Sequence, residues 1–129
     1  MIELPTVRSK ESGVLTVVEN GGSLPFDVRR VYYMYGVPGN RSRGGHAHKH
    51  LHQMIVAAAG SFKVTLYDGK DRKTYDLDRP DRGLFVHSGI WNDLFDFSPE
   101  AVCMVLASTT FDPEDYLSTD EEYNDFLAS

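Results

Sequence analysis

Short apolar or alternating segments, separated by turn residues at close intervals, run from residue 14 to residue 108 of this sequence. Such a pattern favours antiparallel β-strands over a bundle of helices. We expect strands at 14–19, 28–35, 45–49, 53–59, 61–67, 72–77, 84–87, 91–95 and 102–108. Turn residues separate them at 20–22 (NGG), 37–40 (VPGN), 59–61 (AGS) and 67–70 (YDGK). The Asp-Gly pair in the last turn is a strong hairpin signal.

The pattern changes after Ser108, where the segment FDPEDYLSTDEEYNDFL follows. Asp112 can cap a helix whose first position is Pro113, and acidic residues follow in the first turn, where the helix dipole favours them. One or two short helices are therefore expected at the C-terminus.

The number of short strands in 129 residues favours an all-β fold, either a double-sheet jelly roll or a closed barrel, because both remove most exposed strand edges. An immunoglobulin-like sandwich is the structural alternative, although it gives no reason for the histidines described below. No internal repeat, low-complexity segment or linker interrupts the chain. Residues 1–129 are therefore expected to form a single domain.

Charge and hydropathy argue against several classes of function. The net charge of −6 is unsuited to binding DNA or RNA backbones, which requires a basic face. No window approaches the roughly 18–20 consecutive apolar residues of a membrane span, and the start MIELPTVRSKE lacks the features of a signal peptide, so a cytoplasmic protein is expected. The single cysteine, Cys103, lies in an apolar run typical of a buried strand.

Four of the five histidines alternate within RGGHAHKHLHQ, at residues 43–53. If this stretch is extended, His46, His48, His50 and His52 lie on one face of the strand. Imidazoles that face a barrel interior are costly unless they meet a metal, a ligand or water, whereas an exposed face needs no such partner. Imidazole can bind a divalent metal or move protons near neutral pH, so both kinds of site are open at this point.

The spacing of His46, His48 and His52 is close to the first metal motif of the cupin superfamily, in which a carboxylate stands where His52 does here. The second cupin motif would add a histidine within GLFVHSGIWNDLFDFS, but Asn92, a poor transition-metal ligand, holds that position. A metal site made by His46, His48 and His52 is the alternative, with His87 as an outside candidate.

Three long segments carry a resemblance to a known family: PFDVRRVYYMYGVPGNRSRGGHAHKHLHQMIVAAAGSFKVTLYDG, GLFVHSGIWNDLFDFS, and VLASTTFDPEDYL with its YNDF tail. They resemble the sugar-nucleotide 3,4-ketoisomerases that act on dTDP-4-keto-6-deoxyglucose, together with WxcM-like proteins. The resemblance implies a cupin jelly-roll barrel that forms a homodimer and needs no metal or organic cofactor. It also implies a role in making 3-amino-3,6-dideoxyhexoses, such as those of lipopolysaccharide O-antigen.

The implied reaction is a pair of proton transfers. A base removes the acidic proton at C3 of the 4-keto sugar, an enediol or enediolate forms, and a proton returns at C4. Positioned histidines can perform both steps, each contributing roughly 10²–10⁴-fold. The resemblance implies that His48 is the principal base and that His46 protonates or polarises the oxygens. A sugar-nucleotide-binding protein without turnover is a further alternative, for which Asn92 is the main argument.

The resemblance also implies contacts with the substrate. Arg43 precedes the HAH core and suits a phosphate or a developing enolate oxygen. Alternation allows only one of the paired tyrosines to face the barrel, and we favour Tyr33 as the catalytic contact, with Tyr32 as a substrate-binding alternative. Arg30 is a candidate for the pyrophosphate, and Trp91 for a wall of the pocket.

Three positions depart from the family pattern. Asn92 stands where a histidine or arginine facing the sugar is common, and Ser12 where a larger polar residue is common. Both are expected to contact the substrate and to influence which face of C4 receives the proton. Gly45 replaces a bulky aromatic residue before the HAH core. The product configuration at C4, galacto or gluco, is therefore left open.

Overall fold

The computed structural model describes residues 1–129 as a β-rich protein with one short α-helix. The strands are β1 (Ile2–Glu3), β2 (Thr6–Ser9), β3 (Gly13–Thr16), β4 (Arg30–Tyr35), β5 (Arg43–His48), β6 (Gln53–Ala59), β7 (Phe62–Tyr67), β8 (Arg72–Leu77), β9 (Arg82–Val86), β10 (Trp91–Phe95), β11 (Val102–Ala107) and β12 (Tyr116–Leu117). The helical segments are the 3₁₀ helix η1 (Pro113–Asp115) and α1 (Asp120–Ala128). No helix has the length and apolar character needed to cross a membrane.

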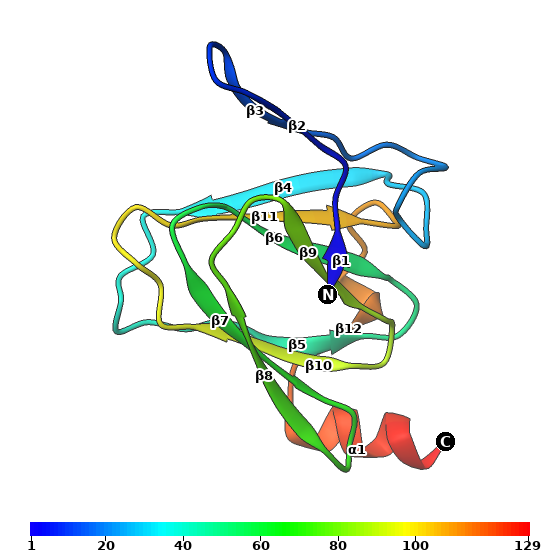
Figure 1. Cartoon of the computed structure of the whole chain (residues 1–129). Helices are drawn as coiled ribbons and strands as arrows, with labels where there is room; N and C mark the ends of the chain where they lie inside the picture. Colours follow the sequence, from blue (N-terminus) through cyan, green and yellow to red (C-terminus); the bar gives the residue numbers. More distant parts are fainter.

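Two five-stranded antiparallel sheets face each other and enclose the interior of the protein (Figure 1). The first sheet has the strand order β1-β9-β6-β11-β4, and the second has the order β12-β5-β10-β7-β8. The all-β cupin jelly roll expected from the sequence, with short helices at the C-terminus, is confirmed. The expected strands are present, three with the predicted bounds (53–59, 72–77 and 91–95) and six with shifted ends. Strands β1, β2 and β12 were not expected because two to four residues give too little periodicity to detect.

Apolar side chains from the inner faces of both sheets form the main core. They are Ile55, Ala57, Phe62, Val64, Leu77, Leu84, Val86, Leu94, Phe97, Ala101, Cys103 and Val105. Strand β6 is apolar on both faces because its outward residues Met54 and Val56 are covered by Leu4 and Leu24 of the N-terminal segment. Burial raises the pKa of the Cys103 thiol to about 12, so this cysteine is an inert core residue.

The hairpin expected at Asp68 and Gly69 joins β7 to β8. The Asp68 carboxylate accepts hydrogen bonds from the backbone N–H groups of Lys70 and Asp71, both at 2.8 Å. Gly69 has a φ of 99°, which side chains disfavour, so the glycine makes this turn possible.

The C-terminal segment packs on the outer face of the second sheet. Asp112 caps η1 by accepting a hydrogen bond from the Glu114 N–H at 3.1 Å, as the sequence predicted. On α1, the Tyr123 hydroxyl donates to the carbonyl oxygens of Tyr67 (3.0 Å) and Gly89 (2.7 Å). These contacts fix the chain between η1 and α1, which carries β12 alongside β5.

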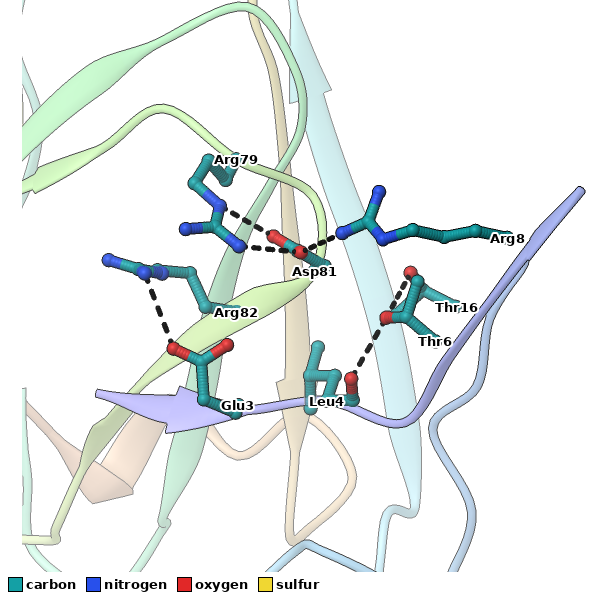
Figure 2. Close-up of polar contacts among 8 residues, drawn as sticks. All are labelled: Glu3, Leu4, Thr6, Arg8, Thr16, Arg79, Asp81 and Arg82. Atoms are coloured by element: carbon teal, nitrogen blue, oxygen red, sulfur yellow. Dashed lines mark hydrogen bonds and ion pairs between the residues drawn. The ribbon is translucent and has the colours of Figure 1, made fainter. Parts of the chain in front are cut away.

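The β2–β3 hairpin projects away from the barrel (Figure 1). Asp81, in the loop before β9, accepts hydrogen bonds from Arg8 of the hairpin at 2.9 Å and from Arg79 at 2.9 and 2.7 Å (Figure 2). The hydrogen bonds from Arg79 are the main reason that the pKa of Asp81 falls to about 2. This ion-pair network joins strand β2 of the hairpin to the loop before β9.

A glycine bulge in β5 shapes the strand that carries the histidines. The pairing of β5 with β10 shifts register between Asn92 and Asp93, and Gly44 and Gly45 there have φ values of 84° and 72°. A Cβ on Gly44 would lie 2.9 Å from the backbone oxygen of Asn92. Gly44 is thus required both for its backbone conformation and for the close approach of β10.

We predict that Gly44→Ala lowers the free energy of unfolding by about 3 kcal/mol or more, because it adds a collision with backbone to the strain of a positive φ. Gly13→Ala is the matched control: Gly13 has a φ of 88° but open space around its Cβ position, so about 1–2 kcal/mol is expected. Urea denaturation measures both. Equal losses for the two variants would contradict the proposed role of the bulge.

Candidate active site

A cavity of about 400 Å³ lies between the two sheets, on the side where β5 and β10 face β4 and β6. Its wall is formed by Tyr32, Met34, Ser42, Arg43, Gly44, His46, Gln53, Ile55, Asn92, Leu94, Val105 and Tyr116. The mixture of apolar surface with a few polar groups is typical of a site for a small polar ligand.

Two histidines lie together at the end of β5. The ring centroids of His46 and His48 are 5.0 Å apart, with the rings edge to face. His46 lines the cavity, whereas His48 is only 3% exposed. Tyr116 packs against both rings, at centroid distances of 5.0 Å from His46 and 4.4 Å from His48. The three rings form one cluster at the cavity wall.

A buried carboxylate lies behind this cluster. Oδ2 of Asp115 is 3.6 Å from Nδ1 of His48. The same carboxylate accepts hydrogen bonds from the backbone N–H groups of His50 (2.9 Å) and Leu51 (3.1 Å). Asp115 is therefore held in place by the loop that follows β5. Both ring nitrogens of His48 are buried and have no hydrogen-bond partner within the chain.

Both histidines of the cluster titrate below the usual range. Burial and the neighbouring His46 lower the pKa of His48, whereas Asp115 raises it. The resulting pKa is about 4. Burial also lowers the pKa of His46. Desolvation and the proximity of a second imidazole both disfavour the charged form. The two rings are consequently neutral at pH 7 and have a nitrogen lone pair available as a base.

The sequence suggested that the alternating histidines share one face of a strand. In the structure they do not. Strand β5 ends at His48, and the chain then turns through residues 49–52. His50 is exposed, and His52 packs outside the barrel against Phe85 and His87, at centroid distances of 5.9 and 4.4 Å. The alternative metal site of His46, His48 and His52 is therefore wrong, because its third member lies on the opposite side of the first sheet.

The two tyrosines of β4 are placed opposite to the favoured assignment. Tyr32 points inward and lines the cavity, and burial raises the pKa of its hydroxyl to about 12. Tyr33 is 62% exposed and stacks with Tyr35 on the outer face, with centroids 6.0 Å apart. Alternation of β4 puts Arg30, Tyr32 and Met34 on the same inner face. The expectation that Tyr33 faces the barrel is therefore wrong.

Arg43 and Asn92 lie where the sequence predicted, in the cavity wall. The guanidinium Nε of Arg43 is 3.4 Å from the sulfur of Met34. Asn92 is fully buried, and its side-chain amide donates to the backbone oxygen of His46 at 3.3 Å. Asn92 thus supports the strand that carries the histidines, in addition to lining the cavity.

Three other predicted contacts lie elsewhere. The guanidinium of Arg30 packs over the rings of Tyr32 and Phe111, at 5.1 and 5.5 Å from their centroids, behind the cavity wall. Trp91 faces α1 and contacts Tyr123, because neighbouring residues on a strand point to opposite sides. Ser12 is exposed in the turn of the β2–β3 hairpin, away from the cavity of its own chain.

Three residues of the cavity region received no role from the sequence: Asp115, Tyr116 and Gln53. Asp115 and Tyr116 belong to the DPEDYL segment, which contributed to the family resemblance and so carried a usable signal. Gln53 begins a predicted strand and closes the histidine-rich stretch, and nothing in its neighbourhood distinguishes it from a surface residue.

A family model described as FdtA (WxcM-like, C-terminal) matches residues 1–128 of this chain. The chain belongs to the FdtA family. A curated relative, the TDP-4-oxo-6-deoxy-alpha-D-glucose-3,4-oxoisomerase of Aneurinibacillus thermoaerophilus, is 39% identical over 116 residues, which are 90% of this chain and 84% of the relative.

Two crystal structures extend the similarity of this FdtA-family chain to its fold. A 3,4-ketoisomerase from Helicobacter canadensis is 31% identical, with a TM-score of 0.94 over 98% of this chain and 95% of the other. A second structure is a histidine-to-asparagine variant of the 3,4-ketoisomerase QdtA from Thermoanaerobacterium thermosaccharolyticum, in complex with TDP-4-keto-6-deoxyglucose. It is 35% identical, with a TM-score of 0.93 over 96% of this chain and 89% of the other. The predicted family is therefore confirmed, and these relatives are enzymes of the predicted class.

We predict that His48 contributes a distinct pH dependence to the stability of this FdtA-family protein. Its pKa is lowered in the folded state, so between pH 7 and pH 5 the unfolded chain binds a proton that the folded protein does not. Stability is therefore lost as pH falls, by about 2 kcal/mol for this group over that range.

Urea denaturation at pH 7 and pH 5 tests this, with His48→Asn expected to reduce the pH-dependent loss by that amount. His50→Asn, at an exposed histidine, is the control and should retain the wild-type difference. If His48→Asn also retains it, His48 is not held neutral in the folded protein.

Proposed function

We propose that this protein is a sugar-nucleotide 3,4-ketoisomerase that converts TDP-4-keto-6-deoxyglucose to its 3-keto isomer. The main support is the pair of neutral imidazoles, His46 in the wall of a cavity and His48 buried against it, in a chain whose relatives are named for this reaction. The reaction moves one proton from C3 to C4 and one from the C3 oxygen to the C4 oxygen, and it leaves the oxidation level of the sugar unchanged overall.

In this proposal His48 is the base that removes the proton from C3. Neither ring nitrogen of His48 has a hydrogen-bond partner within the chain, and Nδ1 lies 3.6 Å from the Asp115 carboxylate. A carboxylate in that position orients the ring and stabilises the imidazolium that forms when the proton is taken up. Asp115 acts through His48 and is a positioning residue. After its N–H exchanges with solvent, the same imidazolium can return a proton, or in D₂O a deuteron, at C4.

His46 and Tyr32 are assigned to the two oxygens of the enediol intermediate. His46 lines the cavity next to His48, and Tyr32 reaches it from the opposite sheet. A neutral imidazole and a neutral phenol donate hydrogen bonds, which stabilise negative charge as it develops on the oxygens. The role first given to Tyr33 therefore passes to Tyr32.

Arg43 is assigned to the diphosphate. It is exposed and borders the cavity, and a guanidinium can bind phosphate oxygens with two parallel hydrogen bonds. Arg30, which packs behind Tyr32, is less suited to that contact.

Isomerisation in D₂O tests the proposal. With TDP-4-keto-6-deoxyglucose we expect the 3-keto product, with deuterium at C4, whether or not a chelator is present. His48→Asn should lower kcat by roughly 10³-fold or more, and Asp115→Asn by about 10-fold or more, because the first removes the base and the second only its orienting partner.

His50→Asn is the matched control, since this exposed histidine contacts neither the cavity nor Asp115 through its side chain, and it should leave kcat unchanged. Tight binding of the sugar nucleotide with no exchange would instead favour a binding protein without turnover. Activity that returns only on addition of a divalent metal would refute the metal-independent mechanism.

We also propose that the protein, a single domain over residues 1–129, forms a homodimer. Three apolar or aromatic residues on the outer face of β4, which is an edge strand, are more than half exposed: Val31, Tyr33 and Tyr35. The projecting β2–β3 hairpin also exposes Val7, Val14 and Leu15. Exposed apolar surface of this extent is typical of a protein interface.

Sedimentation velocity at micromolar concentration should give a dimer of the 14.5 kDa chain. The double substitution Tyr33→Glu and Tyr35→Glu should weaken the dimer at least 100-fold, since each places a charge in an apolar contact. Thr74→Glu, on the exposed face of β8, is the control and should leave the dimer intact. A monomeric wild-type protein would contradict this part of the proposal.

A further inference from the structure

Gln53 is a buried polar residue for which the chain provides no partner. It is the first residue of β6, points into the cavity and is 3% exposed. Its side-chain oxygen Oε1 makes no hydrogen bond within the chain. A buried polar group in this state is destabilising, and most buried polar side chains have at least one partner. The fold alone therefore does not explain why a glutamine is present at position 53.

The surroundings of Gln53 show that an apolar side chain would suit the fold. Ile55 on the same strand and Val105 on the neighbouring strand also line the cavity and belong to the core around it. Cross-strand pairing puts Ala107 beside Gln53 and Arg30 on the far side of Ala107. Nε of Arg30 is also buried without a partner. Two unpaired polar groups thus flank Ala107, and of the two only Gln53 lines the cavity.

Gln53 also faces the reacting groups. Strand β6 belongs to the first sheet and β5 to the second, so the carboxamide of Gln53 lies across the cavity from His46. A carboxamide can turn about its last bond to present either its oxygen or its NH₂ group. A hydroxyl group both donates and accepts, so it can pair with either end.

We infer that Gln53 recognises the 2-hydroxyl of the sugar ring. This rests on the proposed ketoisomerase function and concerns the same cavity. In a 4-keto-6-deoxyhexose, C1 carries the nucleotide, C6 has no hydroxyl, and C3 and C4 exchange ketone and hydroxyl during the reaction. The hydroxyl at C2 is the one that persists from substrate to product, and it is attached to the carbon next to C3.

A contact with a group that does not change in the reaction contributes equally to the ground state and the transition state. It therefore lowers KM and leaves kcat nearly unaltered. This separates Gln53 from His48 and Asp115, whose substitution is expected to lower kcat.

The first test is Gln53→Met, which keeps the size of the side chain and removes the amide. We expect KM for TDP-4-keto-6-deoxyglucose to rise about 10- to 100-fold, with kcat within about threefold of wild type. Affinity for TDP alone should be unchanged, because TDP has no sugar at this position. The melting temperature without ligand should be equal to or above that of wild type, because the substitution removes an unpaired buried group.

The second test uses a substrate without the hydroxyl, TDP-4-keto-2,6-dideoxyglucose. The wild-type protein should bind it about 10- to 100-fold more weakly than the 2-hydroxy compound, whereas Gln53→Met should bind the two equally. Ile55→Met, two residues along β6 and also in the cavity wall, is the matched control and should discriminate as wild type does. Gln53→Glu retains an acceptor and should retain discrimination. Gln53→Leu, which also lacks the amide and should bind the two compounds equally, replaces Gln53→Met if that variant does not fold.

Two results would overturn the inference. One is unchanged KM and unchanged discrimination in Gln53→Met. The other is a lower melting temperature with equal weakening of TDP and both sugar nucleotides, which indicates a structural role. Thermal-shift binding of the two sugar nucleotides does not depend on turnover. If the wild-type protein shows no isomerase activity, the proposed function is wrong. The recognition of the 2-hydroxyl can still be tested by binding alone.

Discussion

The contacts of Asp115 with the loop after β5 determine the rest of the candidate site. Its carboxylate accepts the N–H groups of His50 and Leu51, and its backbone oxygen accepts that of Lys49 at 2.9 Å. These three bonds satisfy the backbone where β5 ends, so the histidine-rich stretch stops being a strand at His48. The same carboxylate lies beside the ring of His48. One buried group therefore ends the strand and lies beside His48, the proposed base.

Electrostatics within the barrel favour neutral rings over charged ones. Burial and the imidazole of His46, whose ring centroid is 5.0 Å away, disfavour protonation of His48, and Asp115 only partly offsets this. A low pKa makes His48 a weak base in the empty protein. In the proposed mechanism, bound substrate excludes water from around the acidic C3 proton, and the nearby carboxylate stabilises the imidazolium as it forms. This arrangement suits a transient proton transfer, in which the charged ring exists only briefly.

Much of the fold and part of the site could be predicted from residue pattern. The strand segments, the Asp68–Gly69 turn and the Asp112 cap depend on neighbouring residues, and all three are present. His46, His48, Arg43 and Asn92 were identified through the family resemblance and lie in or beside the cavity. The errors concern which way a side chain points. The alternation of β4 requires one of Tyr32 and Tyr33 to face inward but does not say which. Only the pairing of β4 with β11 decides it.

The sequence by itself determined the all-β fold, the family and the identity of the histidine pair, because these follow from local periodicity and from motifs that are contiguous in the chain. The tertiary structure alone decided where the histidine row ends, that His52 lies outside the barrel, and that Trp91 packs on α1. It also brought Asp115, Tyr116 and Gln53 to the same cavity from separate parts of the chain. The physical reason is that a one-residue change in where a strand ends or bulges moves a side chain to the opposite face, and long-range pairing sets those positions.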